Sequence, residues 1–313
     1  AKGYDMPPSI SFQGVYPILA TPFHEDEGLD LKSLDRLVRF MADIGVDGVT
    51  VLGVLGEANR LIDAEREAVI RAAVSAAAGR IPVIVGASHP GTSACLTLCR
   101  TAERLGAAAV MVAPSQEPVP NEGRTFEFYR RIAAGVGIPL VVQDHPASTG
   151  VHMSVPLLLK LVAEIPNVAC IKGEAPPTPV KFAALREGMK SREVPILTGL
   201  GALYGIFDLE RGSSGFNTGF AFPEVLIAIV KAVRAGDIER AWKIYGRFLP
   251  LIVFEQQPGI AVRKEILRRR GLIGSARVRH PGAGLDAGAA AQVHALLDRL
   301  LPGVDLTAPL VIG

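Results

Sequence analysis

The sequence predicts a closed (β/α)8 TIM barrel followed by additional C-terminal helices. Two observations lead to this fold. Short apolar segments with the length of buried strands alternate with segments of helical period over residues 15–235. These apolar segments recur mostly about every 25 to 35 residues, as expected for right-handed parallel crossover units. Eight such units favour a closed barrel over an open doubly wound sheet.

The eight predicted strands are apolar segments that end at glycine, proline or polar residues. They cover residues 15–20, 48–53, 81–86, 107–113, 139–143, 168–173, 195–198 and 214–218. The last of them has the weakest pattern.

The predicted helices carry apolar residues three and four positions apart, as in Leu31, Leu34, Leu37, Val38 and Met41. They cover residues 31–41, 63–78, 92–105, 122–134, 155–164, 181–189, 202–210 and 223–235. Asp63 is predicted to cap the second helix, because its side chain can accept a hydrogen bond from the first turn.

We therefore expect two parts, a barrel over residues 1–235 and a helical extension over residues 236–313. Three further helices are predicted in the extension, at residues 238–254, 260–270 and 287–301. They are too few, and too apolar on one face, to form an independent domain. The extension is thus expected to pack on the barrel.

Composition argues against several classes of protein. The net charge of +2 is too close to neutral for a general nucleic-acid or membrane-surface binder. No apolar run reaches the roughly 20 residues of a membrane span, and residues 1–9 lack the apolar core of a signal peptide. The three cysteines are odd in number and include no Cys-x-x-Cys pair, which favours reduced thiols and a cytoplasmic protein.

The most informative segment is residues 168–173, an apolar strand that ends in Lys172. Alternation along a strand puts Lys172 on the same face as Val168 and Cys170. Keeping a buried lysine neutral at pH 7 requires lowering its pKa by roughly 3 units, which costs about 4 kcal/mol. A neutral amine is useful where it must condense with a carbonyl group to form a Schiff base. The alternative is a lysine at a strand end that extends to water.

Active sites of this fold lie at the carboxyl ends of the strands. The polar or glycine-rich sequences expected there are Gly53-Val54-Leu55-Gly56-Glu57, Gln143-Asp144-His145-Pro146, Lys172-Gly173-Glu174 and Gly215-Phe216-Asn217-Thr218-Gly219. Neither a phosphate-binding P-loop nor a dinucleotide-binding loop occurs, and no cluster of His, Cys, Asp or Glu has convincing metal-ligand spacing. We expect Glu57 to cap or brace its loop rather than to react.

Five motifs have the order and spacing found in one superfamily, and the resemblance covers residues 14–272. They are Thr21-Pro22-Phe23, Gly53-x-x-Gly56-Glu57, Pro146-x-x-Thr149-Gly150, Ile171-Lys172 and Gly215-Phe216-Asn217-Thr218-Gly219. With them the chain resembles the dihydrodipicolinate synthase / N-acetylneuraminate lyase superfamily, whose members are class I Schiff-base aldolases. No single motif carries the resemblance.

The resemblance implies that Lys172 forms a Schiff base with pyruvate or another 2-oxo acid. It also implies a homo-oligomer, a dimer or more commonly a tetramer, with no metal or organic cofactor. The substrate-binding residues that it implies are Gly53, Val54, Leu55, Gly56, Asn217, Thr218 and Gly219.

Several residues depart from the family pattern. Val54 and Leu55 replace the hydroxyl residues that hold the carboxylate of the 2-oxo acid, so only backbone N–H groups remain there. Gln143 replaces the tyrosine that shuttles protons, and a carboxamide does not titrate near neutrality. A second family tyrosine is replaced around Ser115-Gln116, and Ser148 stands where some synthases have an arginine. Authentic dihydrodipicolinate synthase activity is therefore not expected.

If the lysine chemistry survives, another group must move protons. His145 is our preferred candidate, because it lies two residues beyond Gln143 and titrates near neutral pH. Glu174 lies two residues beyond Lys172, but Gly173 could interrupt the alternation. A carboxylate so close would also raise the pKa of the amine and oppose nucleophilic attack.

The leading hypothesis is thus a lyase, either an aldolase or a dehydratase, in which Lys172, Gln143 and His145 act on a small 2-oxo acid. Loss of the hydroxyls at Val54 and Leu55 suggests a substrate that is less anionic at that end, or one with an apolar tail. The second hypothesis is a barrel that binds a small acid without turnover. The third, a phosphate-binding barrel enzyme, rests only on glycines near the last two strands.

Overall fold

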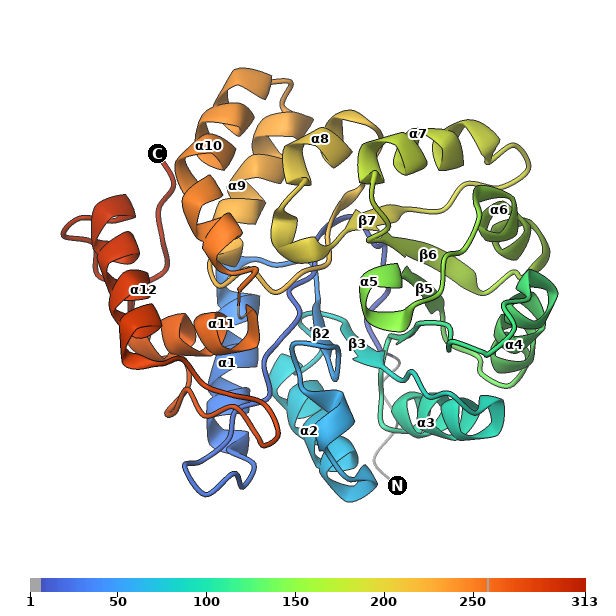
Figure 1. Ribbon diagram of the computed structural model, residues 1–313, viewed down its shortest axis with the longest axis horizontal. Helices are drawn as coiled ribbons and strands as arrows, with labels where there is room; N and C mark the ends of the chain where they lie inside the picture. The colour runs from blue at the N-terminus through green and yellow to red at the C-terminus, as the bar shows by residue number, and fades with distance from the viewer. Residues whose placement is uncertain (1–6, 258) are drawn as a thin grey trace.

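Eight parallel strands form the centre of the molecule. The computed structural model describes residues 7–257 and 259–313 (Figure 1). Residues 1–6, part of the stretch for which no signal peptide is expected, lie outside the described residues. The strands are β1 (Gly14–Val15), β2 (Val49–Val51), β3 (Val83–Gly86), β4 (Ala109–Val112), β5 (Leu140–Asp144), β6 (Val168–Gly173), β7 (Ile196–Thr198) and β8 (Gly215–Phe216). Their order, β1-β8-β7-β6-β5-β4-β3-β2, confirms the predicted barrel.

The barrel closes between β1 and β2 through the segment that follows β1. The predicted strand at residues 15–20 is shortened to Gly14–Val15 because Pro17 has no N–H group for a continuous ladder. Pairing nevertheless continues beyond it. Leu19 N–H donates to the carbonyl of Thr50 at 2.8 Å, and Ile18 and Thr50 form a parallel bridge.

Helices surround the strands in the predicted alternation. They are α1 (Leu31–Ile44), α2 (Asp63–Ala77), α3 (Thr92–Arg104), α4 (Glu122–Ala134), α6 (Val155–Glu164), α7 (Thr178–Gly188), α8 (Gly205–Glu210) and α9 (Pro223–Arg234). The cap predicted at Asp63 is wrong, since Ile62 is the N-cap and Glu65 accepts its N–H at 3.1 Å. Asp63 is instead the first helical residue, with an exposed side chain.

Three short helical turns in loops after strands were not predicted. They are the 3-10 turn Ala58–Arg60, the helix α5 (Pro146–Thr149) and the 3-10 turn Leu200–Ala202. Each is shorter than the window over which helical periodicity can be recognised. All three lie at the carboxyl ends of strands, where the candidate site is expected.

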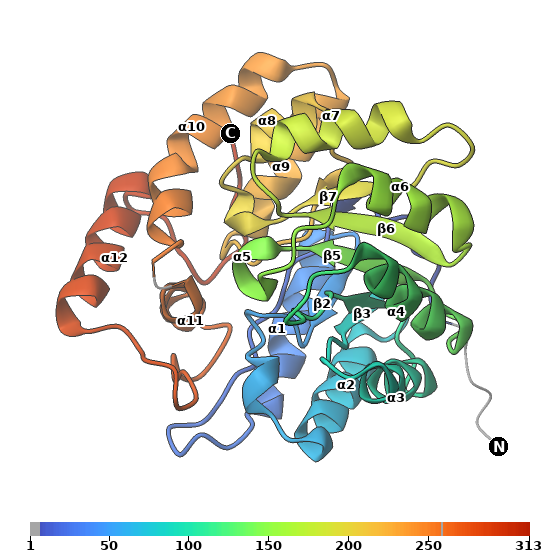
Figure 2. The same cartoon turned by 45° about the vertical axis from the view of Figure 1, so that its right-hand side comes forward.

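The C-terminal extension consists of α10 (Ile238–Phe254), α11 (Gly259–Arg269) and α12 (Ala287–Leu300). These helices gather on the side of the barrel formed by α1, α8 and α9, away from α3 and α4 (Figures 1 and 2). Phe248 and Leu251 of α10 share one buried apolar cluster with Phe216 of β8 and Phe222 beside α9. The extension therefore completes the barrel's core on this side, while a domain boundary at residue 235 stays a prediction.

Two buried ion pairs also tie the extension to the barrel. Lys264 of α11 lies 2.5 Å from Glu57 in the loop after β2, and both side chains are fully buried. Arg270 pairs with Glu224 of α9. Glu57 also accepts hydrogen bonds from Arg60 and from the backbone N–H of Arg279, so it braces its loop as expected. In residues 7–257 and 259–313, no helix combines the length and apolarity needed to cross a membrane.

Candidate active site

Lys172 projects into the barrel from the carboxyl end of β6. Its residue is only 5% exposed, and it pairs in register with Gln143 of β5 and Leu197 of β7. Gly173 faces outward, where an added Cβ would lie 2.6 Å from Phe182 of α7. Alternation therefore continues through Gly173, and Glu174 returns to the side of Lys172.

Glu174 is the residue that the sequence reasoning set aside, and it contacts Lys172. Its Oε1 lies 3.2 Å from Lys172 Nζ and accepts a hydrogen bond from Gln143 Nε2 at 3.0 Å. Its Oε2 accepts the backbone N–H of Leu200 at 2.9 Å. Burial alone would raise the pKa of the Glu174 carboxyl, but Lys172, His145 and the Leu200 N–H hold it below its usual value. The carboxylate is thus ionised and shared between the lysine and neutral donors.

The turn that holds Glu174 has an unusual backbone. Leu200, Gly201 and Ala202 all have positive φ, at 52°, 64° and 66°. The left-handed region costs a residue with a side chain about 1–3 kcal/mol, and such strain concentrates at functional sites. Gly199 makes room for the carboxylate, because an added Cβ would lie 2.3 Å from Glu174 Oε2. No sequence signal beyond the glycines could have indicated this turn.

His145 lies outside the strand that precedes it. Strand β5 ends at Asp144, and His145 is the N-cap of α5 with φ −128° and ψ 74°. The extended geometry assumed for His145 therefore does not persist. Its Nδ1 lies 2.7 Å from the hydroxyl of Ser148, and its side chain is partly exposed. Within the described residues, no hydrogen bond or ion pair joins His145 to Lys172, and its catalytic role stays a prediction.

The loop after β2 presents backbone donors in place of the missing hydroxyls. Within the described chain, the N–H groups of Val54 and Leu55 donate to no protein acceptor. The Val54 side chain is exposed, whereas Leu55 is buried and packs on Gly219, where a Cβ would lie 2.3 Å from its Cδ2. Thr21 Oγ1 donates to the carbonyl of Gly56 at 2.6 Å and braces the loop. These N–H groups are suited to hold a carboxylate.

The strand β8 motif is largely engaged by the protein itself. Asn217 Nδ2 donates to the carbonyl of Tyr16 and to Thr50 Oγ1, at 2.9 and 3.0 Å, which links β8 to the segments at the barrel seam. Thr218 Oγ1 accepts the N–H of Gly201 at 2.7 Å and so supports the strained turn. The substrate-binding roles predicted for Asn217, Thr218 and Gly219 remain untested.

A cavity of about 500 Å³ opens at the ends of β2 to β5, and Gln143 is one of its lining residues. Lys172 and Glu174 do not line it, but Gln143 pairs in register with Lys172 and donates to Glu174. Its lining includes Gly53, Val54 and Arg66, a cation that the sequence reasoning missed. Arg66 donates to the carbonyl of Ala58 at 2.6 Å. The remaining polar lining is mostly uncharged and includes Asn59, Ser88, Ser115, Gln116, Ser148 and Thr149.

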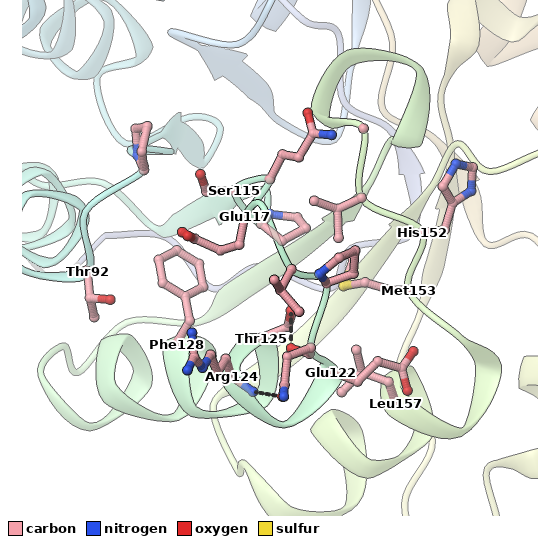
Figure 3. A pocket seen from close by; sticks show the side chains of 18 residues that line it. Thr92, Ser115, Glu117, Glu122, Arg124, Thr125, Phe128, His152, Met153 and Leu157 are labelled. Atoms are coloured by element: carbon pink, nitrogen blue, oxygen red, sulfur yellow. Dashed lines mark hydrogen bonds between the residues drawn. The ribbon is translucent and has the colours of Figure 1, made fainter.

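A second cavity of about 460 Å³ adjoins the first and shares Pro90, Pro114, Ser115 and Gln116 with it. Figure 3 shows Ser115, Glu117 and Phe128 on one side of this cavity and His152 on the opposite side. It lies toward α4, whose residues Glu122, Arg124, Thr125 and Phe128 line it. Within the described residues, no group of three or more His, Cys, Asp or Glu side chains could hold a metal ion.

Comparisons with known proteins agree with this architecture. Residues 11–300 match the dihydrodipicolinate synthetase family. An L-2-keto-3-deoxyarabonate dehydratase from Azospirillum brasilense is 38% identical over 296 residues, which cover 93% of this chain and 95% of that protein. A 4-hydroxy-tetrahydrodipicolinate synthase from Chlorobium luteolum is 33% identical, covering 82% of this chain and 86% of that protein.

Two solved structures extend the comparison to three dimensions. A dihydrodipicolinate synthase from Rhodopseudomonas palustris has a TM-score of 0.89 at 37% identity, covering 94% of this chain and all of that one. The prophage protein YagE from E. coli K12, solved in complex with pyruvate, has a TM-score of 0.85 at 27% identity and covers 92% of this chain and 98% of that one.

Proposed function

The chain belongs to the dihydrodipicolinate synthetase family, an enzyme family of class I lyases, and on that premise we propose that it is a dehydratase that uses a Lys172 Schiff base. The proposed substrate is a 2-keto-3-deoxy sugar acid, the class named for the Azospirillum relative. The observation that carries this proposal is the buried group formed by Lys172, Glu174 and Gln143, of which Gln143 lines the 500 Å³ cavity.

The cavity lining supports a hydroxylated substrate. A five-carbon 2-keto-3-deoxy acid carries a carboxylate at one end and hydroxyls at C4 and C5. The free N–H groups of Val54 and Leu55 suit the carboxylate, and the hydroxyl and amide side chains of the 500 Å³ cavity suit the other end. Leu52, Val54 and Met111 also line this cavity, so the expectation of an apolar tail stays a prediction.

The proposed reaction begins with transfer of the Lys172 ammonium proton to Glu174, which lies 3.2 Å away. The neutral amine then attacks C2 of the substrate, and the carbonyl oxygen leaves as water when the C=N bond forms. The carboxylate of Glu174 provides the acceptor for that proton once the carbonyl is bound.

In the dehydration step, a base removes a proton from C3 and the C4 hydroxyl leaves as water. Glu174 is our candidate for this base and for the acid that protonates the leaving hydroxyl, with no net gain or loss of protons. Gln143 cannot titrate, but its amide orients Glu174 and faces the cavity. Hydrolysis of the Schiff base regenerates Lys172.

Mass spectrometry of the product tests this function. With a 2-keto-3-deoxypentonate the proposal predicts a product lighter than the substrate by one water. Formation of pyruvate and a two-carbon aldehyde would instead identify an aldolase. Slow turnover with pyruvate and aspartate semialdehyde compared with the sugar acid would separate this enzyme from the lysine-biosynthetic synthases.

A barrel that binds a small acid without turnover remains the second candidate, because Val54 and Leu55 replace the usual hydroxyls. Saturable binding that persists in Lys172→Ala, with no exchange of C3 protons into deuterated water, would favour it. Exchange that depends on Lys172 would eliminate it.

We also propose that the chain forms a homo-oligomer. Val54, Ile62 and Val119 are apolar side chains with 59%, 67% and 72% exposure on the loops near the two cavities. Their burial in a partner would remove apolar surface from water at the rim of the site. Light scattering that gives a monomer at micromolar concentration would contradict this assignment.

A further inference from the structure

The C-terminal extension reaches the turn that holds Glu174. Gln256, just beyond the end of α10, donates from Nε2 to the carbonyl of Leu200 at 3.1 Å and to that of Ile252 at 3.1 Å. Tyr245 of α10 donates from its hydroxyl to the carbonyl of Leu203 at 2.6 Å. Two side chains of α10 and its C-terminal end thus hold the outer side of the turn.

Gln256 packs directly against the strained backbone. A Cβ added to Gly201 would lie 2.5 Å from Gln256 Nε2 and 2.6 Å from Arg263 Nη2. Gly201 therefore has to be glycine both for its positive φ and for this close approach. On the inner side, Gly201 N–H is held by Thr218 Oγ1 at 2.7 Å.

The two peptide groups that flank the Cα of Leu200 are consequently held from opposite directions. The N–H of Leu200 donates inward to Glu174 Oε2 at 2.9 Å, and its carbonyl accepts outward from Gln256. Leu200 has φ 52°, a conformation that it would not keep without support. If the outer bond were lost, the turn could relax and the inner N–H would move away from Glu174.

We propose that Gln256 is a positioning residue, which keeps the Leu200 N–H aimed at Glu174 and so sets the proton transfer by that carboxylate. This inference rests on the proposed function, because it concerns the proton-transfer step and not formation of the Schiff base. It makes the extension a part of the active site rather than only a support for the barrel.

The effect on proton transfer has a defined sign. A hydrogen bond to a carboxylate stabilises its charged form, so losing the Leu200 N–H raises the pKa of Glu174. The charged or titratable groups near Glu174 are Lys172 on β6, His145 after β5, and Asp144 at the end of β5, which pairs with Lys181 of α7. Arg263 of α11 lies beyond the turn. These groups are unchanged in Gln256 variants, so the acid limb of the kcat profile should move to higher pH.

Two variants test the proposal. Gln256→Leu removes the amide, and Gln256→Glu keeps its size but removes its donors. We expect each to lower kcat about tenfold and to move the acid limb upward by about half to one pH unit. Gln257→Leu is the matched control, since Gln257 is the exposed neighbour and should retain wild-type kcat and pH profile.

Borohydride trapping on the same proteins distinguishes failure of the Gln256 positioning role from failure of the proposed function. The variants should give the wild-type extent of Lys172 adduct, with melting temperatures that show folded protein. Wild-type kcat and acid limb in both Gln256 variants, or an equal loss in Gln257→Leu, would overturn the positioning role alone. An unmodified Lys172 in the wild-type protein would overturn the proposed function, and this inference with it.

Discussion

Two buried lysine–glutamate pairs in this barrel have very different surroundings. Lys172 Nζ lies 3.2 Å from Glu174 Oε1, and Lys264 Nζ lies 2.5 Å from Glu57 Oε2. Lys264 also donates to the carbonyl of Arg277 at 2.7 Å and lies 4.3 Å from the centre of the Phe23 ring. In the part of the chain that the structure describes, Lys172 has one polar partner, Glu174.

The two carboxylates, Glu57 and Glu174, also differ in the groups that contact them. Glu57 contacts two cations, Lys264 and Arg60, and accepts the N–H of Arg279. Glu174 has one cationic neighbour in contact and otherwise neutral donors. Burial and pairing therefore do not by themselves identify a reactive amine. An ammonium has three donors, and a lysine with donors left beside a cavity is the one that can meet a substrate.

The largest expected difference between the pairs is in catalysis. Lys172→Met should lower kcat by about 10⁴-fold or more, because no other amine occupies the covalent position. The rate of water elimination from a 2-keto-3-deoxypentonate measures this loss. Retention of more than a tenth of the wild-type rate would show that the reaction does not pass through this amine.

The second pair should show its effect in stability. Lys264→Met leaves Glu57 buried without its nearest cation, and breaking such a pair typically costs about 3–5 kcal/mol. Urea unfolding should therefore give a lower free energy of unfolding than in the wild type. Adding Glu57→Gln to Lys264→Met should recover part of it. A loss below about 1 kcal/mol would mean that the pair is not an anchor.

Substitutions at Glu174 and His145 compare the two candidate proton-transfer groups directly. Glu174→Gln keeps the size of the side chain but removes its proton acceptor, and we expect kcat to fall about 10²- to 10³-fold. His145→Gln should lower kcat by less than about tenfold, because His145 contacts Ser148 rather than Lys172. If a steady-state assay showed a larger loss of kcat in His145→Gln than in Glu174→Gln, His145 would again be the preferred proton-transfer group, as assigned from the sequence.

A third buried carboxylate, Glu255, makes stability depend on pH. Glu255 pairs with Arg263 at 3.7 Å, and burial raises its pKa from 4.5 to about 7. The folded protein thus binds a proton between these values that the unfolded chain has released. Stability should fall by about 1–3 kcal/mol as the pH rises from 4.5 to 7. Glu255→Gln should flatten this trend in urea unfolding, and an unchanged slope would contradict it.

The sequence predicted the barrel because its strands and helices have strong local patterns. Residues 168–173 were predicted as a strand, and β6 covers Val168–Gly173. Shorter segments were less predictable. The end of the first strand depends on Pro17, and the small turns after β2, β5 and β7 have no period to recognise.

The candidate site was predictable in its lysine and less so in its partners. Lys172 stands out as a charged residue at the end of an apolar strand. Glu174 was set aside because Gly173 was expected to interrupt alternation, but Gly173 belongs to β6 and accommodates Phe182 on the outside. The roles of the Leu200 N–H and of Gln256 could not be predicted from the sequence pattern. Their positions depend on a left-handed turn and on contacts 56 residues apart in the chain.

Borohydride reduction with a 2-keto-3-deoxypentonate, followed by peptide mapping, tests the central claim most directly. The two buried lysines serve as each other's control in one sample. The account predicts that one substrate-derived adduct appears on Lys172 and that Lys264 stays unmodified. An unmodified Lys172 under turnover conditions, or an adduct on Lys264, would contradict it.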